Sequence, residues 1–572
     1  MSARPSLGLL HPGPPRSAPS GAGRPFARLP LAAVGALLVS ALVACAGRTA
    51  PPASGAGPAA GPGGERWDIL IRGGTVVDGS GGARYRADVA IRGDRIVRVS
   101  PRALDPSRAA RVVDATGRVV APGFIDTHAH PTELLEVRGA ESSVRQGVTT
   151  ILGGLCGGSP WPIGAAYDSV DAGGAGLNVA YYVGHNTVRE EVMGLDDRAP
   201  TADELSRMRA MVARGMGEGA WGFSTGLIYL PGAFAATDEV VALAEAAGDS
   251  GGLYVSHLRS EGEGLLQGVG ELLEIARRAR VPGVISHHKA SGRNAWGLSI
   301  RSLALIDSAR RAGVDVEMDQ YPYTATSTGI SVLVPTWALA GGDSAFAARL
   351  RVPALRDSIF RGTVASLDTG RGGRELRRVQ FARVPWDTTL EGRTLEDWAR
   401  RRGIEPTMEN GARLVLEAVA NGGAGAMFHV LDEADVERIM RHPFTAIGSD
   451  GSLARPGVGH PHPRSYGTFV RVLGRYVRER RVLTLEDAVR KMTWLPAERL
   501  GLDRRGRLAE GWYADVVVFD PATVADAATF ERPHQYAAGV DHVIVNGRFA
   551  VDGGAGTGVL AGRALRHPAA RR

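Results

Sequence analysis

Residues of the kinds that bind metal ions stand at the ends of short apolar runs that recur through the middle of the chain. Helix-like periodicity separates these runs, for example over residues 239–247 and 269–280. Repeated strand–helix units of this kind predict an α/β fold with a parallel sheet, here a (β/α)8 TIM-like barrel. In such barrels the carboxyl ends of the strands meet at one mouth and carry the active site. Five runs lead into histidine, cysteine or aspartate, at residues 122–130, 147–157, 254–259, 284–289 and 446–451.

The first of these runs ends in His128-Ala129-His130. Alternate residues of a strand point to the same side, so both imidazoles can face one metal ion. The alternative, two surface histidines in a turn, does not explain why the pair directly follows an apolar strand.

The second run leads into a glycine-rich loop that holds Cys156, and the chain has one other cysteine, Cys45. An isolated cysteine is usually a packing residue. Beside a divalent cation, however, its thiol would lose its proton and could serve as a ligand.

The remaining runs end in His257, His287 and Asp450. Both histidines follow a serine, and their spacing of 30 residues matches one strand–helix repeat. Each alone could be a hydrogen-bonded core histidine. Asp450 could be a metal ligand, a general base or both, and its alternative role is a helix N-cap.

Both ends of the chain are rich in β-forming residues, at 68–72, 88–92, 514–520 and 543–547. We therefore expect residues 66–122 and 505–560 to form one small β-sandwich around a barrel at 123–504. Residues from about 335 to 440 fit the barrel repeat poorly, and 351–383 are charged and irregular. We expect this segment to be an insertion near the barrel mouth.

The N-terminus carries an apolar run at residues 29–44 that is short for a membrane span and has the size of a secretory signal core. It ends Leu-Val-Ala-Cys at Cys45, which resembles a bacterial lipobox. We expect a signal peptide at 1–45, a lipid on Cys45 and a flexible tether at 46–65. The protein would then be exported and anchored to a membrane, at the periplasmic face of the outer membrane. A plain transmembrane anchor is the alternative.

The formal net charge of +7 is spread along the chain and is not gathered into a basic cluster with aromatic residues. We therefore expect a small-molecule substrate and no nucleic-acid partner.

Taken in this order, the five motifs resemble the amidohydrolase superfamily, and within it the N-acyl-D-amino-acid deacylase (D-aminoacylase) family. Segments 222–229, 319–323 and 462–469 add to the likeness. Many members of the superfamily bridge their metals with a carboxylated lysine. The chain has only two lysines, Lys289 and Lys491, and neither lies between His130 and His257. The D-aminoacylase branch uses a cysteine there instead.

The resemblance implies a zinc-dependent hydrolase that cleaves the amide bond of N-acyl-D-amino acids. A tight Zn2+ site and a weaker second site would share Cys156, and Asp450 would transfer protons. Leu155 departs from relatives that often have asparagine there, which puts the geometry around the zinc in doubt. The implied residues are His257 and His287 with Cys156 at the tight site, His128, His130 and Asp450 with Cys156 at the weaker one, and Lys289, Tyr321, Ser327 and Arg464 at the substrate.

Two rival hypotheses differ from this one. The first is a cyclic-amide hydrolase of the same superfamily, resembling dihydroorotases or hydantoinases. The second is a catalytically inactive, lipid-anchored binding protein with a decayed barrel, which predicts gaps among the ligand positions.

Overall fold

The structure is a computed structural model that describes residues 65–571. The predicted signal peptide, Cys45 and nearly all of the tether lie outside the described residues. Within the described part, no helix is long and apolar enough to cross a membrane.

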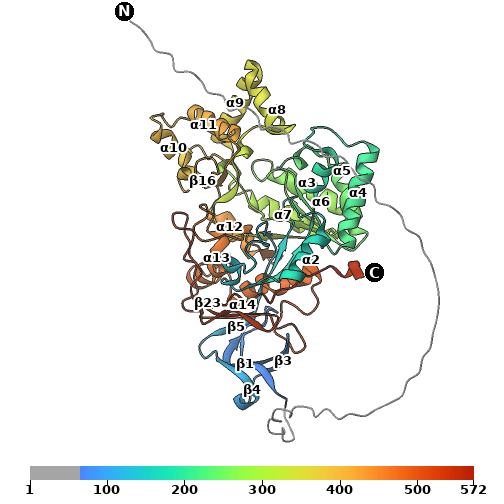
Figure 1. The fold of residues 1–572 in the computed structure, drawn as a ribbon, viewed down its shortest axis with the longest axis vertical. Helices are drawn as coiled ribbons and strands as arrows, with labels where there is room; N and C mark the ends of the chain where they lie inside the picture. Colours follow the sequence, from blue (N-terminus) through green and yellow to red (C-terminus); the bar gives the residue numbers. More distant parts are fainter. Residues whose placement is uncertain (1–64, 572) are drawn as a thin grey trace, which may run out of the picture. The chain divides into compact units, whose positions relative to one another are not determined.

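The two ends of this body meet in one nine-stranded sheet (Figure 1). Its N-terminal and C-terminal halves join where β20 pairs antiparallel with β5. The order is β23-β22-β21-β20-β5-β1-β2-β3, with β4 paired to β1. The strands are β1 (Trp67–Val76), β2 (Tyr85–Arg92), β3 (Arg95–Ser100), β4 (Ala109–Asp114), β5 (Val119–Pro122), β20 (Val516–Phe519), β21 (Val540–Val545), β22 (Arg548–Asp552) and β23 (Ala555–Gly556).

The central strands of this sheet are apolar on both faces because each face covers a different core. Successive side chains of a strand point to opposite faces. In β20, Val516 and Val518 pack with Ile69 and Val89 inside the β domain. Val517 and Phe519 belong to the core of the barrel. The sheet is therefore a β domain fixed to one side of the barrel.

Eight strand positions form the barrel, and every pairing between them is parallel. The third position is split into β9 and β10 by Tyr182, whose amide donates to Gly153 O of the preceding strand. In chain order the strands are β6 (Phe124–Asp126), β8 (Val148–Gly153), β9 (Asn178–Tyr181) with β10 (Val183–Gly184), β11 (Gly222–Gly226), β12 (Leu253–His257), β13 (Gly283–Ile285), β14 (Val316–Gln320) and β18 (Thr445–Ile447).

The first and last barrel strands are joined just beyond their carboxyl ends. There β7 (Ala129–His130) pairs in parallel with β19 (Gly451–Ser452). The amide of Asp450 donates to His128 O at 2.6 Å. Main-chain hydrogen bonds therefore fix the first and last motifs of the sequence beside each other.

Helices surround the barrel and bury one face each. In α6, the buried Leu265, Val269, Leu272 and Ala276 recur three or four residues apart, as the helical period requires. The helices of this body include α1 (Glu141–Val144), α2 (Ile163–Gly173), α3 (His185–Met193), α4 (Ala202–Gly217), α5 (Thr237–Gly248), α6 (Leu265–Ala279), α7 (Ser299–Arg311), α12 (Glu433–Arg441), α13 (Arg464–Arg471), α14 (Leu485–Met492) and α15 (Trp494–Leu500).

An insertion between β14 and α12 has its own hydrophobic core, which includes Ile359, Phe381 and Phe428. Its sheet is antiparallel, in the order β15-β17-β16. Figure 1 shows its helices gathered at the end of the body away from the nine-stranded sheet. The elements are β15 (Thr326–Gly329), α8 (Gly342–Arg351), α9 (Pro353–Thr369), β16 (Val379–Arg383), α10 (Leu395–Arg401), α11 (Met408–Ala420) and β17 (Gly425–Phe428).

The barrel with a β domain from both chain ends and an inserted segment confirms the predicted fold class. The expected limits of the insertion, about 335–440, differ from those observed. The insertion begins at β15, a Thr-Ser-Thr-Gly strand with no apolar pattern. It ends before α12, whose Val436, Ile439 and Met440 pack in the barrel core. The segment expected to be irregular also contains the regular helix α9.

Candidate metal centre

The sulfur of Cys156 lies at the centre of a cluster of imidazoles from three other strand ends. Its Sγ is 3.4 Å from His128 Nε2, 3.6 Å from His257 Nδ1 and 3.4 Å from His287 Nε2. All four side chains are buried. Residues separated by up to 159 positions in the chain thus present one sulfur and three nitrogens to a common point.

Each of these spacings is that of a sulfur and a nitrogen ligand bound to the same zinc ion. Zinc binds sulfur at about 2.3 Å and imidazole nitrogen at about 2.0 Å in tetrahedral sites, so a sulfur and a nitrogen ligand are about 3.5 Å apart. The three sulfur–nitrogen distances here match that edge. The donor set of thiolate, imidazole and carboxylate is also one that zinc prefers. The residues present therefore fit a zinc ion.

A carboxylate and the second histidine of the His-X-His pair complete the cluster. One donor atom from each of His128, Cys156, His287 and Asp450 lies within 4.8 Å of the other three. Asp450 Oδ1 is 2.9 Å from His130 Nε2 and 3.6 Å from His128 Nε2. Four of the six residues implied as ligands thus form one close group; His130 joins it through its contact with Asp450, and His257 through its contact with Cys156.

Three of the clustered residues have left-handed backbone conformations. The φ angles are 52° at Cys156, 34° at His287 and 51° at Asp450. Such angles are uncommon for residues with a side chain and are retained where the surroundings fix them. Each residue lies where a strand gives way to a loop, so the sharp turn of the backbone directs its side chain toward the cluster.

Charge in the cluster favours the ionised forms of its acidic groups. Burial would raise the pKa of the Cys156 thiol, but His128 and His287 beside it hold that pKa well below its usual value. Burial also opposes ionisation of Asp450, yet Arg464 and His287 keep the pKa of its carboxyl well below its usual range. Thiolate and carboxylate are the forms that bind a cation.

A buried glutamate that the sequence motifs did not single out supports the cluster. Glu261 Oε1 is 3.1 Å from His287 Nδ1, and Glu261 Oε2 is 3.3 Å from His257 Nε2. Lys289 Nζ donates to Glu261 Oε1 at 2.5 Å and lies 2.7 Å from His287 Nδ1. Arg371, from the insertion, donates to Glu261 Oε2 at 3.2 Å.

Glu261 thus contacts the outward nitrogens of two imidazoles whose inward nitrogens face Cys156. Carboxylates in this position fix the tautomer and the ring orientation of metal-binding histidines. The only sequence signal for it was an acidic residue four positions after a strand-end histidine, which is too common to be informative. His257, Glu261 and His287 also form a second group with the spacing of metal ligands.

Two further buried aspartates hold the backbone of the cluster. Asp126 accepts hydrogen bonds from the amides of His128 and Ser449, at 3.1 and 2.8 Å. Asp319 accepts from the amide of His287 at 2.6 Å. These bonds link the first, sixth, seventh and eighth strand positions, so the ligand positions are set by the barrel itself.

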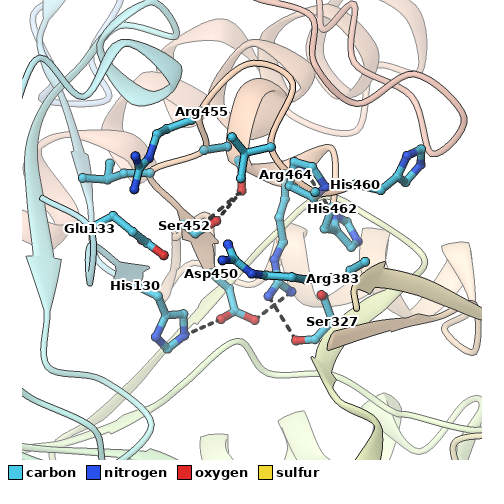
Figure 2. Close-up of a pocket in the computed structure, with 17 residues that line it drawn as sticks. His130, Glu133, Ser327, Arg383, Asp450, Ser452, Arg455, His460, His462 and Arg464 are labelled. Atoms are coloured by element: carbon cyan, nitrogen blue, oxygen red, sulfur yellow. Dashed lines mark hydrogen bonds and ion pairs between the residues drawn. The ribbon is translucent and has the colours of Figure 1, made fainter. Parts of the chain in front are cut away.

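A polar cavity of about 240 Å3 opens on one side of the cluster (Figure 2). His130, Asp450, Ser327 and Arg464 all line it. Arg464 Nη1 is 2.8 Å from Asp450 Oδ2, and Arg464 Nη2 donates to Ser327 O at 3.3 Å. Arg383 and Arg455 also line the cavity, so three guanidinium groups border it; Figure 2 shows Arg455 on the side of Glu133, away from Arg464.

The other two residues implied at the substrate do not line this cavity. Lys289 is paired with Glu261, and burial lowers the pKa of its ammonium. Tyr321 lies between Lys289 and Arg464. The Lys289 ammonium is 5.5 Å from the centre of the Tyr321 ring, and the Arg464 guanidinium is 4.8 Å from it. The Tyr321 hydroxyl is buried and has no hydrogen-bond partner among the described residues.

Sequence comparison places this chain among enzymes of known activity. The profile of the amidohydrolase family matches residues 111–551. The chain is 40% identical to the N-acyl-D-glutamate deacylase of Alcaligenes xylosoxydans xylosoxydans, over 84% of this chain and 93% of that protein. It is 39% identical to the D-aminoacylase of the same organism, over 88% of this chain and 98% of that protein.

Solved structures that resemble this chain include enzymes with the same named activities. One is an N-acyl-D-glutamate deacylase from Bordetella bronchiseptica, complexed with zinc and a phosphonate inhibitor that mimics the tetrahedral intermediate. It has a TM-score of 0.74 and 36% identity, and the match covers 88% of this chain and all of that one. A D-aminoacylase described as having a binuclear metal centre has a TM-score of 0.74 and 38% identity, over 87% of this chain and all of that one. A D-hydantoinase, at 16% identity and a TM-score of 0.52, shares the fold.

Replacing the central sulfur tests the metal centre. Cys156→Ala removes the donor nearest to three imidazoles, so we expect the purified protein to bind less than half as much zinc as the wild type, measured by atomic emission after dialysis. His288→Gln is the matched control, because His288 is buried beside His287 but is hydrogen-bonded to Ser302 at 2.8 Å instead of facing the cluster. Equal zinc content in wild type and Cys156→Ala would exclude Cys156 as a ligand.

Proposed function

This chain belongs to the amidohydrolase family, and from that premise we propose that it is a zinc-dependent deacylase that hydrolyses the amide bond of N-acyl-D-amino acids. The observation that carries the proposal is the arrangement of Cys156 among three imidazoles, with Asp450 and a cationic cavity directly beside it. The products would be a D-amino acid and a carboxylic acid.

Amide hydrolysis needs a stronger nucleophile than neutral water and a more electrophilic carbonyl than a free amide. A zinc ion held by Cys156, His257 and His287 would supply both, by lowering the pKa of a water to ~7 and by polarising the carbonyl. His128, His130 and Asp450, with Cys156, would hold a second ion more weakly. The Cys156 thiolate would be shared by the two ligand groups, in the role that the resemblance gives to a carboxylated lysine in many relatives.

Asp450 is the residue we propose as the proton carrier. It is buried, reaches both His128 and His130, and also lines the polar cavity. Because Arg464 and His287 hold the pKa of its carboxyl low, Asp450 is ionised at neutral pH, which is the form that can accept a proton. It would return that proton to the departing amine nitrogen, which cannot leave as an anion.

The cationic wall of the cavity suits a substrate that carries a carboxylate. Arg464 is buried, and its planar guanidinium can bind a carboxylate through two parallel hydrogen bonds. Arg383 forms no ion pair with any of the described residues. With the amide at the metal cluster and the carboxylate at Arg464, the amino-acid side chain fits on one face only. The D configuration is proposed from the named activities of the similar enzymes.

A cyclic-amide hydrolase remains the second candidate, because the two reactions use the same metal chemistry. A hydantoin or dihydropyrimidine has no free carboxylate to meet Arg464, whereas dihydroorotate carries one. The buried guanidinium therefore favours a linear N-acyl amino acid over a hydantoin, and these two substrates should respond differently when Arg464 is removed.

Asp450→Asn removes the proton acceptor while it keeps the size of the side chain. We expect kcat on N-acetyl-D-amino acids to fall by about 10²–10⁴, the usual contribution of general acid–base catalysis. Zinc should be retained at the tight site, as measured in the same preparation. Asp503→Asn, at a largely exposed aspartate, is the control. Turnover close to the wild-type value would remove Asp450 from the proton-transfer role.

Arg464→Ala tests carboxylate recognition with a substrate panel. We expect kcat/KM for N-acetyl-D-amino acids to fall about 10- to 100-fold, the loss of a charge-assisted hydrogen bond. For N-acetyl amines without a carboxylate, the decrease in log(kcat/KM) should be less than half of the decrease for N-acetyl-D-amino acids. Arg566→Ala, which breaks an exposed pair with Asp168, is the control. The same panel should show L enantiomers and cyclic amides turned over poorly; preference for the cyclic amides would favour the rival hypothesis.

We also propose that the protein is exported and anchored through a lipid on Cys45, because the lipobox-like segment and the Ala/Gly/Pro-rich stretch after it suit a tethered enzyme. In a bacterial host, the wild type should take up labelled palmitate and sediment with membranes, and Cys45→Ala should do neither. Membrane association of Cys45→Ala equal to that of the wild type would instead indicate the transmembrane anchor.

A further inference from the structure

A second, larger cavity opens onto the metal cluster from another side. Its volume is about 520 Å3, which is within the range of small-molecule sites. The residues that line it come from the loop after β7, the glycine-rich loop after β8, α2, α3 and the third strand position. They include Leu134, Leu135, Leu155, Gly158, Tyr181 and Thr187.

The two cavities meet at the metal cluster and share His130. Cys156 lines only the second cavity, whereas Asp450 and Arg464 line only the first. Donor atoms of Cys156 and Asp450 nevertheless lie within 4.8 Å of each other. A substrate whose reacting carbon sits at the cluster can therefore extend into both cavities at once.

The lining of the second cavity differs in chemistry from that of the first. It contains no Asp, Glu, Lys or Arg, and its only titratable groups are His130, Cys156 and Tyr181. Leu134 and Leu155 are almost fully buried, whereas Leu135 is 50% exposed at the same wall. An uncharged, largely aliphatic lining of this kind suits an apolar ligand better than a charged one.

We propose that this second cavity is the acyl subsite and that it takes an uncharged aliphatic acyl group longer than acetyl. The inference rests on the proposed function, since it assigns the amine side of the amide to the arginine-lined cavity. Besides its oxygen and the amide nitrogen, the carbonyl carbon of the substrate carries only the acyl chain. With the amine part in the first cavity, the second cavity is the space left for that acyl chain. Acetyl would leave most of that volume to water.

The acyl chain should contribute to transition-state binding in proportion to the apolar surface it buries. Each fully buried methylene contributes about fourfold, from ~0.8 kcal/mol per group. Because the cavity is open on one side, we expect less than this limit, about 10- to 100-fold in kcat/KM between acetyl and octanoyl. A charged acyl group such as succinyl finds no partner among the lining residues and should be hydrolysed poorly.

The test is a series of N-acetyl, N-butanoyl, N-hexanoyl and N-octanoyl derivatives of D-leucine and D-glutamate, with the zinc-loaded full chain. The inference predicts that kcat/KM rises along the series. A flat or falling series, with acetyl hydrolysed, would overturn the acyl subsite and leave the proposed function intact. No hydrolysis of any member would instead count against the proposed function.

Two variants locate the effect in the second cavity. Leu135→Glu places a charge on its exposed wall. Gly158→Val fills it, since a Cβ at Gly158 would meet nothing nearer than Leu155 O at 4.0 Å. Both should lower the octanoyl-to-acetyl ratio of kcat/KM at least fivefold. The control Ile300→Glu changes an aliphatic residue on α7 that is 59% exposed and lies outside the cavity, and it should keep the ratio. Unchanged ratios in both cavity variants would overturn the assignment.

Calorimetry gives a readout that does not depend on turnover. Octanoate, the product of the longest substrate, should bind the zinc-loaded protein at least tenfold more tightly than acetate, and Leu135→Glu should reduce that difference. Equal affinities for octanoate and acetate would contradict an apolar acyl site even if the enzyme proved inactive on every substrate tested.

Discussion

The contact of one buried sulfur with three imidazole nitrogens is the interaction on which the rest of this site depends. Burial disfavours a thiolate, and here the positive charge of nearby histidines outweighs that cost. A divalent cation at the same point would compensate the thiolate more fully and would replace protons on the imidazoles. The cluster is therefore a site of high local charge that a bound metal ion would stabilise.

The barrel provides this convergence because its strand ends meet at one mouth and its backbone fixes each turn. Left-handed conformations at Cys156, His287 and Asp450 are costly on their own. Asp126 accepts hydrogen bonds from the amides of His128 and Ser449, and Asp319 accepts one from the amide of His287, which holds the turns at Asp450 and His287 in place. Buried carboxylates around the cluster thus hold its backbone in these uncommon conformations. Glu261 belongs to the same set of carboxylates and connects the cluster to Arg371 of the insertion.

Much of this site follows from the sequence, because the period of strand–helix repeats places each motif at a strand end. The His-X-His pair, Cys156 and Asp450 could be singled out as candidates from local patterns, and the resemblance to a known family assigned them to one site. Glu261 could not, since its role depends on the approach of His257, His287 and Lys289 in space. The sequence also could not show that Lys289, expected at the substrate, pairs with Glu261, because the two residues meet only in the folded chain. The C-terminal limit of the insertion was placed too late. An amphipathic helix such as α12 has the same sequence pattern whether it packs on the insertion or on the barrel.

X-ray absorption at the zinc edge of the metal-loaded protein tests the central claim most directly. The account predicts one sulfur neighbour at about 2.3 Å, with nitrogen or oxygen neighbours at about 2.0 Å completing the shell. A spectrum fitted by nitrogen and oxygen alone would show that Cys156 does not hold the metal and would contradict the account.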